Sequence, residues 1–144
     1  MSIQAVKGVE IGDAFSNAKK FGSEVHDEIF VDADKNIFRK TNRAGGIEGG
    51  MSNGEPVIIR AAMKPIPTLM KPLNSIDIER RLPVTASKER SDTCAIWAAS
   101  VVGEAMAAIV TADAIVEKFG GDALIDTLQN LKSYCERIGK TYEK

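Results

Sequence analysis

The hydrophobic pattern of this sequence changes its period near Thr93, and this change constrains the fold more than any other feature. Upstream, short apolar runs alternate with polar and turn-forming residues, as is typical of strands. Downstream, apolar residues recur at helical spacing in two stretches separated by Gly120 and Gly121. The two apolar stripes are formed by Ile96, Val101, Ala105, Ile109, Ala112 and Val116, and by Leu124, Leu128, Leu131, Cys135 and Ile138. Strands first and two long helices last predict an α+β fold, and 144 residues favour a single domain over residues 1–144.

The upstream region is predicted to hold several strands and one short helix. Asp13 is a candidate N-cap for a helix over residues 14–21, which Gly22 ends, and Asp122 lies near the cap of the last helix. Strands are expected at residues 6–11, 56–63 and 75–79, a hairpin at residues 28–31 and 37–40, and a loop over residues 42–54.

The composition excludes several classes of protein. A net charge of -1 argues against a nucleic-acid partner. Two cysteines and one histidine predict no disulfide framework and no zinc site, and they favour a reduced, cytoplasmic setting. The apolar run over residues 95–110 is interrupted by Ser100, Gly103 and Glu104, so we predict a buried helix and no membrane span, with Trp97 in a core or an interface.

Charge is distributed unevenly along the chain. Residues 1–34 carry a net charge of -4, residues 35–90 carry +6, and residues 91–144 carry -3. The cationic middle also holds five of the twelve glycines within ten residues. Because glycine lets backbone amides approach a ligand, this region predicts a site for a phosphorylated or carboxylated small molecule. A solvated basic surface beside a mobile loop is the alternative.

Three segments are candidates for that site. The glycine loop matches neither a P-loop nor a dinucleotide fingerprint. The two prolines of residues 64–68 make that segment stiff, so it either presents Lys64 and Thr68 to an anion or is a simple connector. In an extended segment Arg90 and Asp92 point to the same side, where the arginine would keep the carboxylate available as a proton acceptor. An Asp92 that caps the following helix and pairs with Arg90 is the alternative.

Several motifs together resemble the chorismate synthase family. They are KGVEIGD at residues 7–13, NRAGGIEGGMSNG at 42–54, RAAMKPIPT at 60–68, ERSDTC at 89–94 and GEAM at 103–106. The resemblance implies a βαβα sandwich and a homotetrameric lyase of the shikimate pathway. The family converts 5-enolpyruvylshikimate 3-phosphate to chorismate by 1,4-elimination of phosphate and requires reduced FMN. Its members are more than twice as long, so this chain is interpreted as a C-terminal portion without the family's catalytic histidines and most of its substrate arginines.

The resemblance also assigns site residues. Asp92 matches the carboxylate that assists proton transfer near the flavin. The positions that match cofactor-binding residues are Gln4, Ala5, Gly49, Lys64, Pro65, Ile66, Pro67, Thr68 and Arg90.

Three functions follow as hypotheses. The first is a chorismate synthase portion that contributes flavin and phosphate contacts and is inactive alone. The second is a non-catalytic, self-associating fragment, because the helix over residues 95–119 is apolar on nearly every side. The third is a free-standing phosphate- or flavin-binding module.

Overall fold

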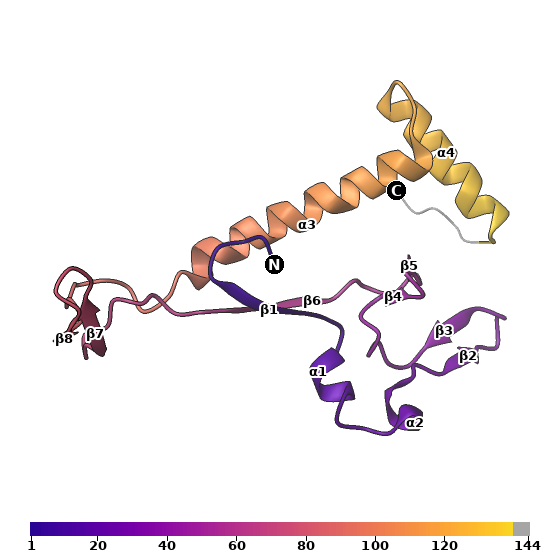
Figure 1. Ribbon diagram of the computed structural model, residues 1–144. Helices are drawn as coiled ribbons and strands as arrows, with labels where there is room; N and C mark the ends of the chain where they lie inside the picture. The colour runs from indigo at the N-terminus through magenta and orange to yellow at the C-terminus, as the bar shows by residue number, and fades with distance from the viewer. Residues whose placement is uncertain (140–144) are drawn as a thin grey trace. The chain divides into compact units, whose positions relative to one another are not determined.

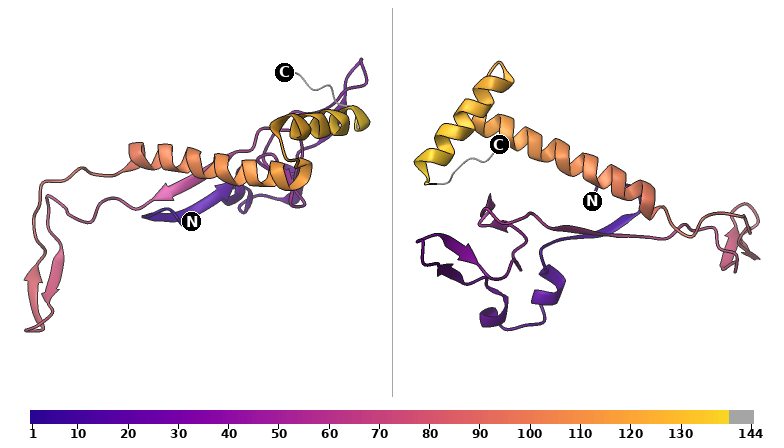
Figure 2. Two further views of the ribbon diagram at one scale, coloured as in Figure 1. Left: turned by 90° about the horizontal axis from the view of Figure 1, so that it is seen from above. Right: turned by 180° about the vertical axis from the view of Figure 1, so that it is seen from behind.

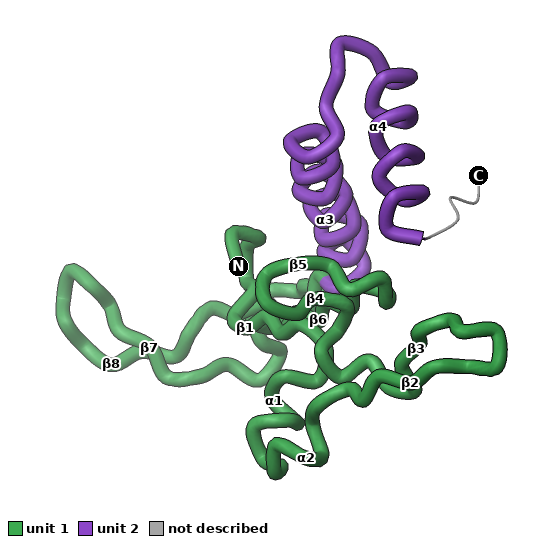
Figure 3. The backbone as a smooth tube through the Cα atoms, turned by 90° about the vertical axis from the view of Figure 1, so that its right-hand side faces the viewer, with its two compact units in different colours: residues 1–95 green, residues 96–144 purple. Residues whose placement is uncertain are grey.

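The computed structural model describes residues 1–139, and its residues group into two compact units (Figure 3). One unit comprises residues 1–95 and the other begins at Ile96. The first contains the strands and two short helices, and the second contains the two long helices. The prediction of an α+β fold is confirmed, and the single domain over residues 1–144 stays a prediction.

The longest strand pair of the first unit joins β1 (Val6–Ile11) to β6 (Ile59–Met63), as Figure 1 shows. The two strands are antiparallel, with Val6 opposite Met63 at one end and Ile11 opposite Ile59 at the other. The register shifts between Val6 and Gly8. Both strands lie within segments that the sequence predicts to be extended. Residues 12–58 lead from the end of β1 to the start of β6, and the chain from residue 64 onward leaves β6 at its other end.

Two short helices follow β1, where the sequence predicts one longer helix. They are α1 (Ala14–Asn17) and α2 (Gly22–Val25), so the prediction of a helix over residues 14–21 that ends at Gly22 is wrong. The apolar side chains of this region are exposed, Phe15 at 64% and Phe21 at 80%. Without a packed apolar face, so short a helix has little to stabilise it.

The predicted Asp13 cap is also not formed as expected. Asp13 occupies the N-cap position of α1, but its side chain accepts no hydrogen bond from that helix. Its Oδ1 instead accepts a hydrogen bond from Arg60 Nη1 at 3.0 Å.

Three antiparallel hairpins complete the first unit. The predicted hairpin is confirmed as β2 (Ile29–Val31) and β3 (Ile37–Arg39). The predicted loop contains a small hairpin of β4 (Ile47–Glu48) and β5 (Met51–Ser52), and the strand predicted at residues 75–79 is β7 (Asn74–Asp77). Its partner β8 (Leu82–Thr85) was missed because Pro83 argues against a strand, although a two-stranded ribbon tolerates proline at its edge.

The second unit is a pair of helices, α3 (Ile96–Phe119) and α4 (Leu124–Arg137), as the sequence predicts (Figure 2). Phe119 and Tyr134 meet edge to face, with ring centroids 5.4 Å apart. Asn130 Nδ2 donates to the carbonyl oxygens of Phe119 and Gly120, which would otherwise be unpaired at the end of α3. The N-cap of α4 is Ala123, whose N–H donates to Asp126, so Asp122 lies next to the cap, as predicted.

Apolar burial is sparse in the part of the chain that the structure describes. Val6 is its buried hydrophobic residue, and no residue of α3 is buried. Trp97 is 86% exposed, so its predicted place in a core is wrong within this chain, and its place in an interface stays a prediction. Helix α3 is long and apolar enough to cross a membrane by length and composition, a test that core helices of soluble proteins also pass. The predicted burial of this helix is not observed here.

Candidate functional site

The residues expected to bind a cofactor begin just before β1, beside the end of β6. Val6 pairs with Met63, and the backbone N–H of Lys64 donates to the carbonyl oxygen of Ala5 at 2.7 Å. Ala5 has a left-handed backbone with φ 62°, so the chain turns sharply before it enters β1. The structure therefore brings Gln4 and Ala5 to Lys64, from a position about sixty residues away in the sequence.

The extended segment of residues 64–68 also contacts the residues that precede α3. The N–H of Ile66 donates to the carbonyl oxygen of Thr93 at 3.1 Å. The hydroxyl oxygens of Thr68 and Ser91 lie 2.8 Å apart, and the Ser91 hydroxyl donates to the Thr68 carbonyl at 3.1 Å. These contacts hold residues 90–93 beside the segment. We call residues 4–5, 64–68 and 90–93 together the Lys64 cluster.

Few backbone donors of residues 64–67 remain for a ligand. Pro65 and Pro67 have no N–H, and the N–H groups of Lys64 and Ile66 are already used. The Thr68 hydroxyl is shared with Ser91. A ligand at residues 64–67 would therefore be held chiefly by the Lys64 side chain.

The charged side chains of this cluster are exposed and without ion-pair partners. Within residues 1–139, no ion pair of 4 Å or less involves Lys64, Arg90 or Asp92. The Asp92 carboxylate also accepts no hydrogen bond there, so the alternative in which it caps a helix and pairs with Arg90 is not observed. Two free cations and one free carboxylate on these joined segments could attract an anion and supply a proton acceptor.

Arg60, in the same unit, is a cation whose charge is neutralised by acidic partners. It lies opposite Glu10 in the β1–β6 register, and its Nη1 is 3.8 Å from Glu10 Oε1 and 3.0 Å from Asp13 Oδ1. The same Nη1 also donates to the Gly12 carbonyl oxygen. Arg60 therefore fixes the end of β1, whereas Lys64 keeps its charge available.

Gly49 does not join the Lys64 cluster. It occupies the two-residue turn between β4 and β5 with Gly50, at φ values of 58° and 77°. Positive φ at both positions is what the common tight hairpin turn requires. The preceding loop contacts the start of β6, because the Ile58 N–H donates to Gly45, whereas Lys64 follows the end of β6. Hydrogen bonds thus join the Lys64 segment to the segment of residues 91–93 and do not involve Gly49, and the meeting of these stretches around one pocket stays a prediction.

The glycine loop has a structural role that the sequence did not reveal. A Cβ on Gly45 would lie 2.2 Å from the Gly12 nitrogen, and a Cβ on Gly12 would lie 2.1 Å from the Arg43 carbonyl oxygen. Both glycines have a positive φ of 64°. The loop can therefore touch the end of β1 only because side chains are absent at both positions.

Asp27 is the residue that sequence reasoning missed. It is 8% exposed, and its carboxylate accepts hydrogen bonds from the Thr41 hydroxyl at 2.5 Å and from the N–H groups of Arg43 and Ala44 at 2.9 Å each. We call these contacts the Asp27 knot. They tie the base of the β2–β3 hairpin to the glycine loop.

The environment of Asp27 favours its charged form. Burial alone would raise the pKa of this carboxyl. The hydrogen bonds from Thr41, Arg43 and Ala44, with the positive charge of Arg43, outweigh burial and hold the pKa below its ordinary value. The predicted hairpin could have indicated the contact between Asp27 and Thr41. Ile29 pairs with Arg39, and the same register continued by two residues places Asp27 opposite Thr41.

Residues 1–139 contain no candidate metal site. No group of three or more histidine, cysteine or acidic side chains among them is placed to hold an ion. Cys94 and Cys135 are free thiols.

Sequence comparisons match this chain to one family of known proteins. A sequence model of chorismate synthase matches residues 1–116. Curated chorismate synthases from Pelobacter propionicus and Thermus thermophilus are 57% and 55% identical to this chain, each over 96% of it. The chain spans 37% and 36% of the length of these two relatives.

The solved structures include a similar protein as well. A crystal structure of a chorismate synthase matches 96% of this chain with a TM-score of 0.74 and 46% sequence identity. This chain covers 34% of that protein. The similarity therefore extends over nearly all of this chain and over about a third of each relative.

Proposed function

Because this chain belongs to the chorismate synthase family, we propose that it is the C-terminal portion of an enzyme that converts 5-enolpyruvylshikimate 3-phosphate to chorismate and phosphate. The reaction is a 1,4-elimination that uses reduced FMN, and the family is one of lyases in the shikimate pathway. Since this chain spans about a third of the relatives' length, our proposal includes that it carries only part of the active site. We expect it to be inactive alone and to bind FMN weakly.

The observation that supports this function best is the Lys64 cluster. Three segments that are distant in the sequence meet there through backbone and hydroxyl hydrogen bonds, and their two cations are free of ion pairs among the described residues. FMN is anionic and the leaving group is phosphate, so the donor set fits both in charge. Reduced FMN, when bound, supplies the electronic chemistry of the elimination.

The proposed roles of the residues follow from this arrangement. Lys64 and Arg90 hold anionic groups, and the stiff prolines of residues 64–68 keep the lysine in place. Gln4 and Ala5 contact the flavin at the turn before β1. Asp92 accepts or returns a proton at its carboxylate.

Gly49 remains a proposed cofactor contact on family resemblance alone. Nothing lies within 4 Å of the position that a Cβ would take at Gly49, so its backbone is open to a ligand. In this chain the tight turn by itself explains why glycine is there.

The wider setting is also proposed from the family. We propose a cytoplasmic homotetramer that acts on a small anionic substrate and binds neither nucleic acid nor a membrane. No metal takes part in this proposal.

A non-catalytic, self-associating fragment is the second candidate, and one observation favours it. Large apolar side chains of α3 are exposed, among them Ile96, Val101, Ile109, Val110 and Val116. An exposed apolar helix promotes association. Sedimentation of this chain over a range of concentrations, together with an FMN titration, separates the two candidates.

FMN titration with and without dithionite tests the proposed cofactor site. We expect reduced FMN to bind this chain and the Lys64→Ala variant to bind it roughly tenfold more weakly, since a charge-assisted hydrogen bond is lost. The effect should shrink as salt is added. Lys71→Ala removes a charge from the same connector outside the cluster and serves as the control.

Two outcomes would contradict the proposal. One is an equal FMN affinity of the Lys64→Ala and Lys71→Ala variants. The other is the absence of FMN binding together with concentration-dependent association, which favours the self-associating fragment.

The role of Asp92 is tested in the longer enzyme. Asp92→Asn should lower turnover with little change in FMN affinity, because the cofactor keeps its cationic contacts. A large loss of FMN affinity with normal turnover at saturation would show that Asp92 does not handle the proton.

A further inference from the structure

A second cationic site lies in the first unit, away from the Lys64 cluster. A hollow of about 420 Å³ opens between the segment around α2 and the base of the β2–β3 hairpin. It shares no residue with the Lys64 cluster.

The lining of the hollow is mainly basic and polar. Lys20, Lys40 and Arg43 contribute three positive charges, and none of them forms an ion pair of 4 Å or less within residues 1–139. Glu24 and Glu28 are the acidic residues of the lining. The Glu24 carboxylate already accepts the N–H of Phe21 at 3.1 Å, at the start of its own helix.

The walls of the hollow are held in place by the Asp27 knot. Asp27 binds the hydroxyl of Thr41 and the backbone N–H of Arg43, two lining residues. Arg43 Nη1 in turn lies 3.5 Å from the His26 carbonyl oxygen, at the limit of a hydrogen bond. The Asp27 carboxylate makes its hydrogen bonds within the knot, and its charge interacts with that of Arg43.

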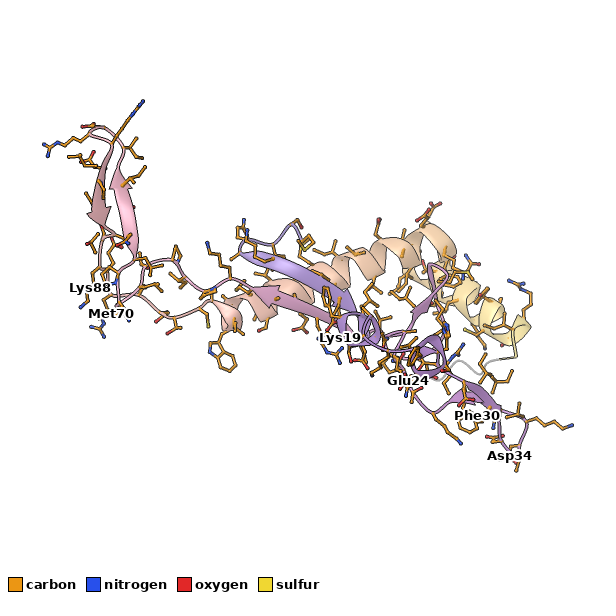
Figure 4. The ribbon with its side chains drawn as sticks, turned by 60° about the horizontal axis from the view of Figure 1, so that its bottom comes forward. Lys19, Glu24, Phe30, Asp34, Met70 and Lys88 are labelled. Carbon is orange, nitrogen blue, oxygen red and sulfur yellow. The ribbon has the colours of Figure 1, made fainter. Side chains whose placement is uncertain are left out.

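The aromatic residue of the lining is fixed as well. Lys40 Nζ lies 4.1 Å from the centre of the Phe30 ring, a cation–π contact that holds the ammonium group at the rim. Figure 4 labels Glu24 and Phe30, which come from α2 and β2 and line the hollow, and Lys88, which lies outside it.

We propose that this hollow binds a small, multiply charged anion of the phosphate-ester class through Lys20, Lys40 and Arg43. The hydroxyls of Ser23 and Thr41 supply further donors. The chemistry fits an anion because positive charge exceeds negative charge in a preformed hollow. A protein partner fits less well, since Phe30 is the large apolar residue of the lining and protein interfaces depend on buried apolar anchors.

The probe is inorganic pyrophosphate, titrated into this chain at low salt by calorimetry. The Lys40→Ala and Arg43→Ala variants should each bind it roughly tenfold more weakly, because each removes a charge-assisted contact. Arg43→Ala keeps the backbone N–H that Asp27 accepts, and the amide signals of Arg43 and Ala44 report in a magnetic resonance spectrum whether the loop is intact. Lys88→Ala is the matched control and should leave the affinity unchanged.

Each outcome bears on the proposal in one direction. No pyrophosphate binding, or equal binding by the Arg43→Ala and Lys88→Ala variants, overturns it. A loss caused by Lys64→Ala instead would assign the anion to the Lys64 cluster and also overturns it. Preferential binding of an acidic peptide would assign the hollow to a protein partner. The inference is independent of the cofactor site, because FMN affinity should be unchanged by Arg43→Ala.

Discussion

Two irregular segments flank β6, and they use their polar groups in opposite ways. In the glycine loop before the strand, the N–H groups of Arg43 and Ala44 donate to Asp27. The loop's carbonyl oxygens accept the N–H groups of Asp13, after β1, and Ile58, before β6. The proline segment after the strand is tied through its backbone to Ala5 and Thr93, and it leaves the charge of Lys64 free. The first segment determines structure, and the second is suited to a ligand. In this chain, available positive charge and not glycine content distinguishes the proposed cofactor site.

Adding a methyl group to the glycine loop tests this difference between the two segments most strongly. Gly45→Ala would place a Cβ 2.2 Å from the Gly12 nitrogen, so we expect the loop to detach from β1 at a cost above about 4 kcal/mol. Hydrogen exchange should show the Gly12, Asp13 and Ile58 amides losing their protection.

Gly49→Ala is the matched control for Gly45→Ala. Its φ of 58° is nearly the same as the 64° of Gly45, but nothing lies within 4 Å of its added Cβ. We expect only the cost of a left-handed alanine, about 1–2 kcal/mol. Equal effects of the two substitutions would mean that close contact does not determine the loop.

Substitution of Asp27 should cause the next largest loss of stability. Asp27→Asn removes the charge that three donors share, and we expect a loss of about 2–4 kcal/mol in the local stability of the loop. Faster exchange of the Arg43 and Ala44 amides would measure this loss.

The same residue gives the loop a defined pH dependence. The pKa of Asp27 is lowered in the folded chain, so its contribution is complete above the ordinary value of 3.8 and is lost as the pH falls through the lower folded value. In a pH titration, the amide shifts of Arg43 and Ala44 should move with a midpoint below 3.8. A midpoint above 3.8 would show that burial outweighs the hydrogen bonds.

The hydroxyl contact of the proline segment gives the smallest effect. Thr68→Val removes the bond to Ser91 at an exposed position, which should cost about 1 kcal/mol or less. FMN affinity should fall by only a few-fold, because the Ile66 and Lys64 backbone contacts remain. Serine at position 68 keeps the hydroxyl and is expected to behave like the natural residue.

The sequence predicted elements well where local signals suffice. Alternation and glycine punctuation located β1, the β2–β3 hairpin and both long helices, since these depend on spacing along the chain. The helix over residues 14–21 failed because its apolar face has nothing to pack against in this chain.

The sequence indicated some residues of the candidate site and missed others. The Lys64 segment was assigned to the site through the family resemblance, because its prolines and lysine alone fit a simple connector as well. Asp27 was missed because its role depends on partners 14 to 17 residues away, and Gly49 was grouped with Lys64 although different ends of β6 contact their segments. Such contacts depend on register and cannot be read from composition.

A double-mutant cycle on reduced-FMN binding tests most directly whether ammonium and guanidinium from two distant segments hold one ligand. Lys64→Ala and Arg90→Ala should each weaken binding roughly tenfold, and the double variant should lose less than the product of the two losses if both contact the same anionic group. Unchanged affinity in both single variants would contradict the assignment of the Lys64 cluster as the cofactor site.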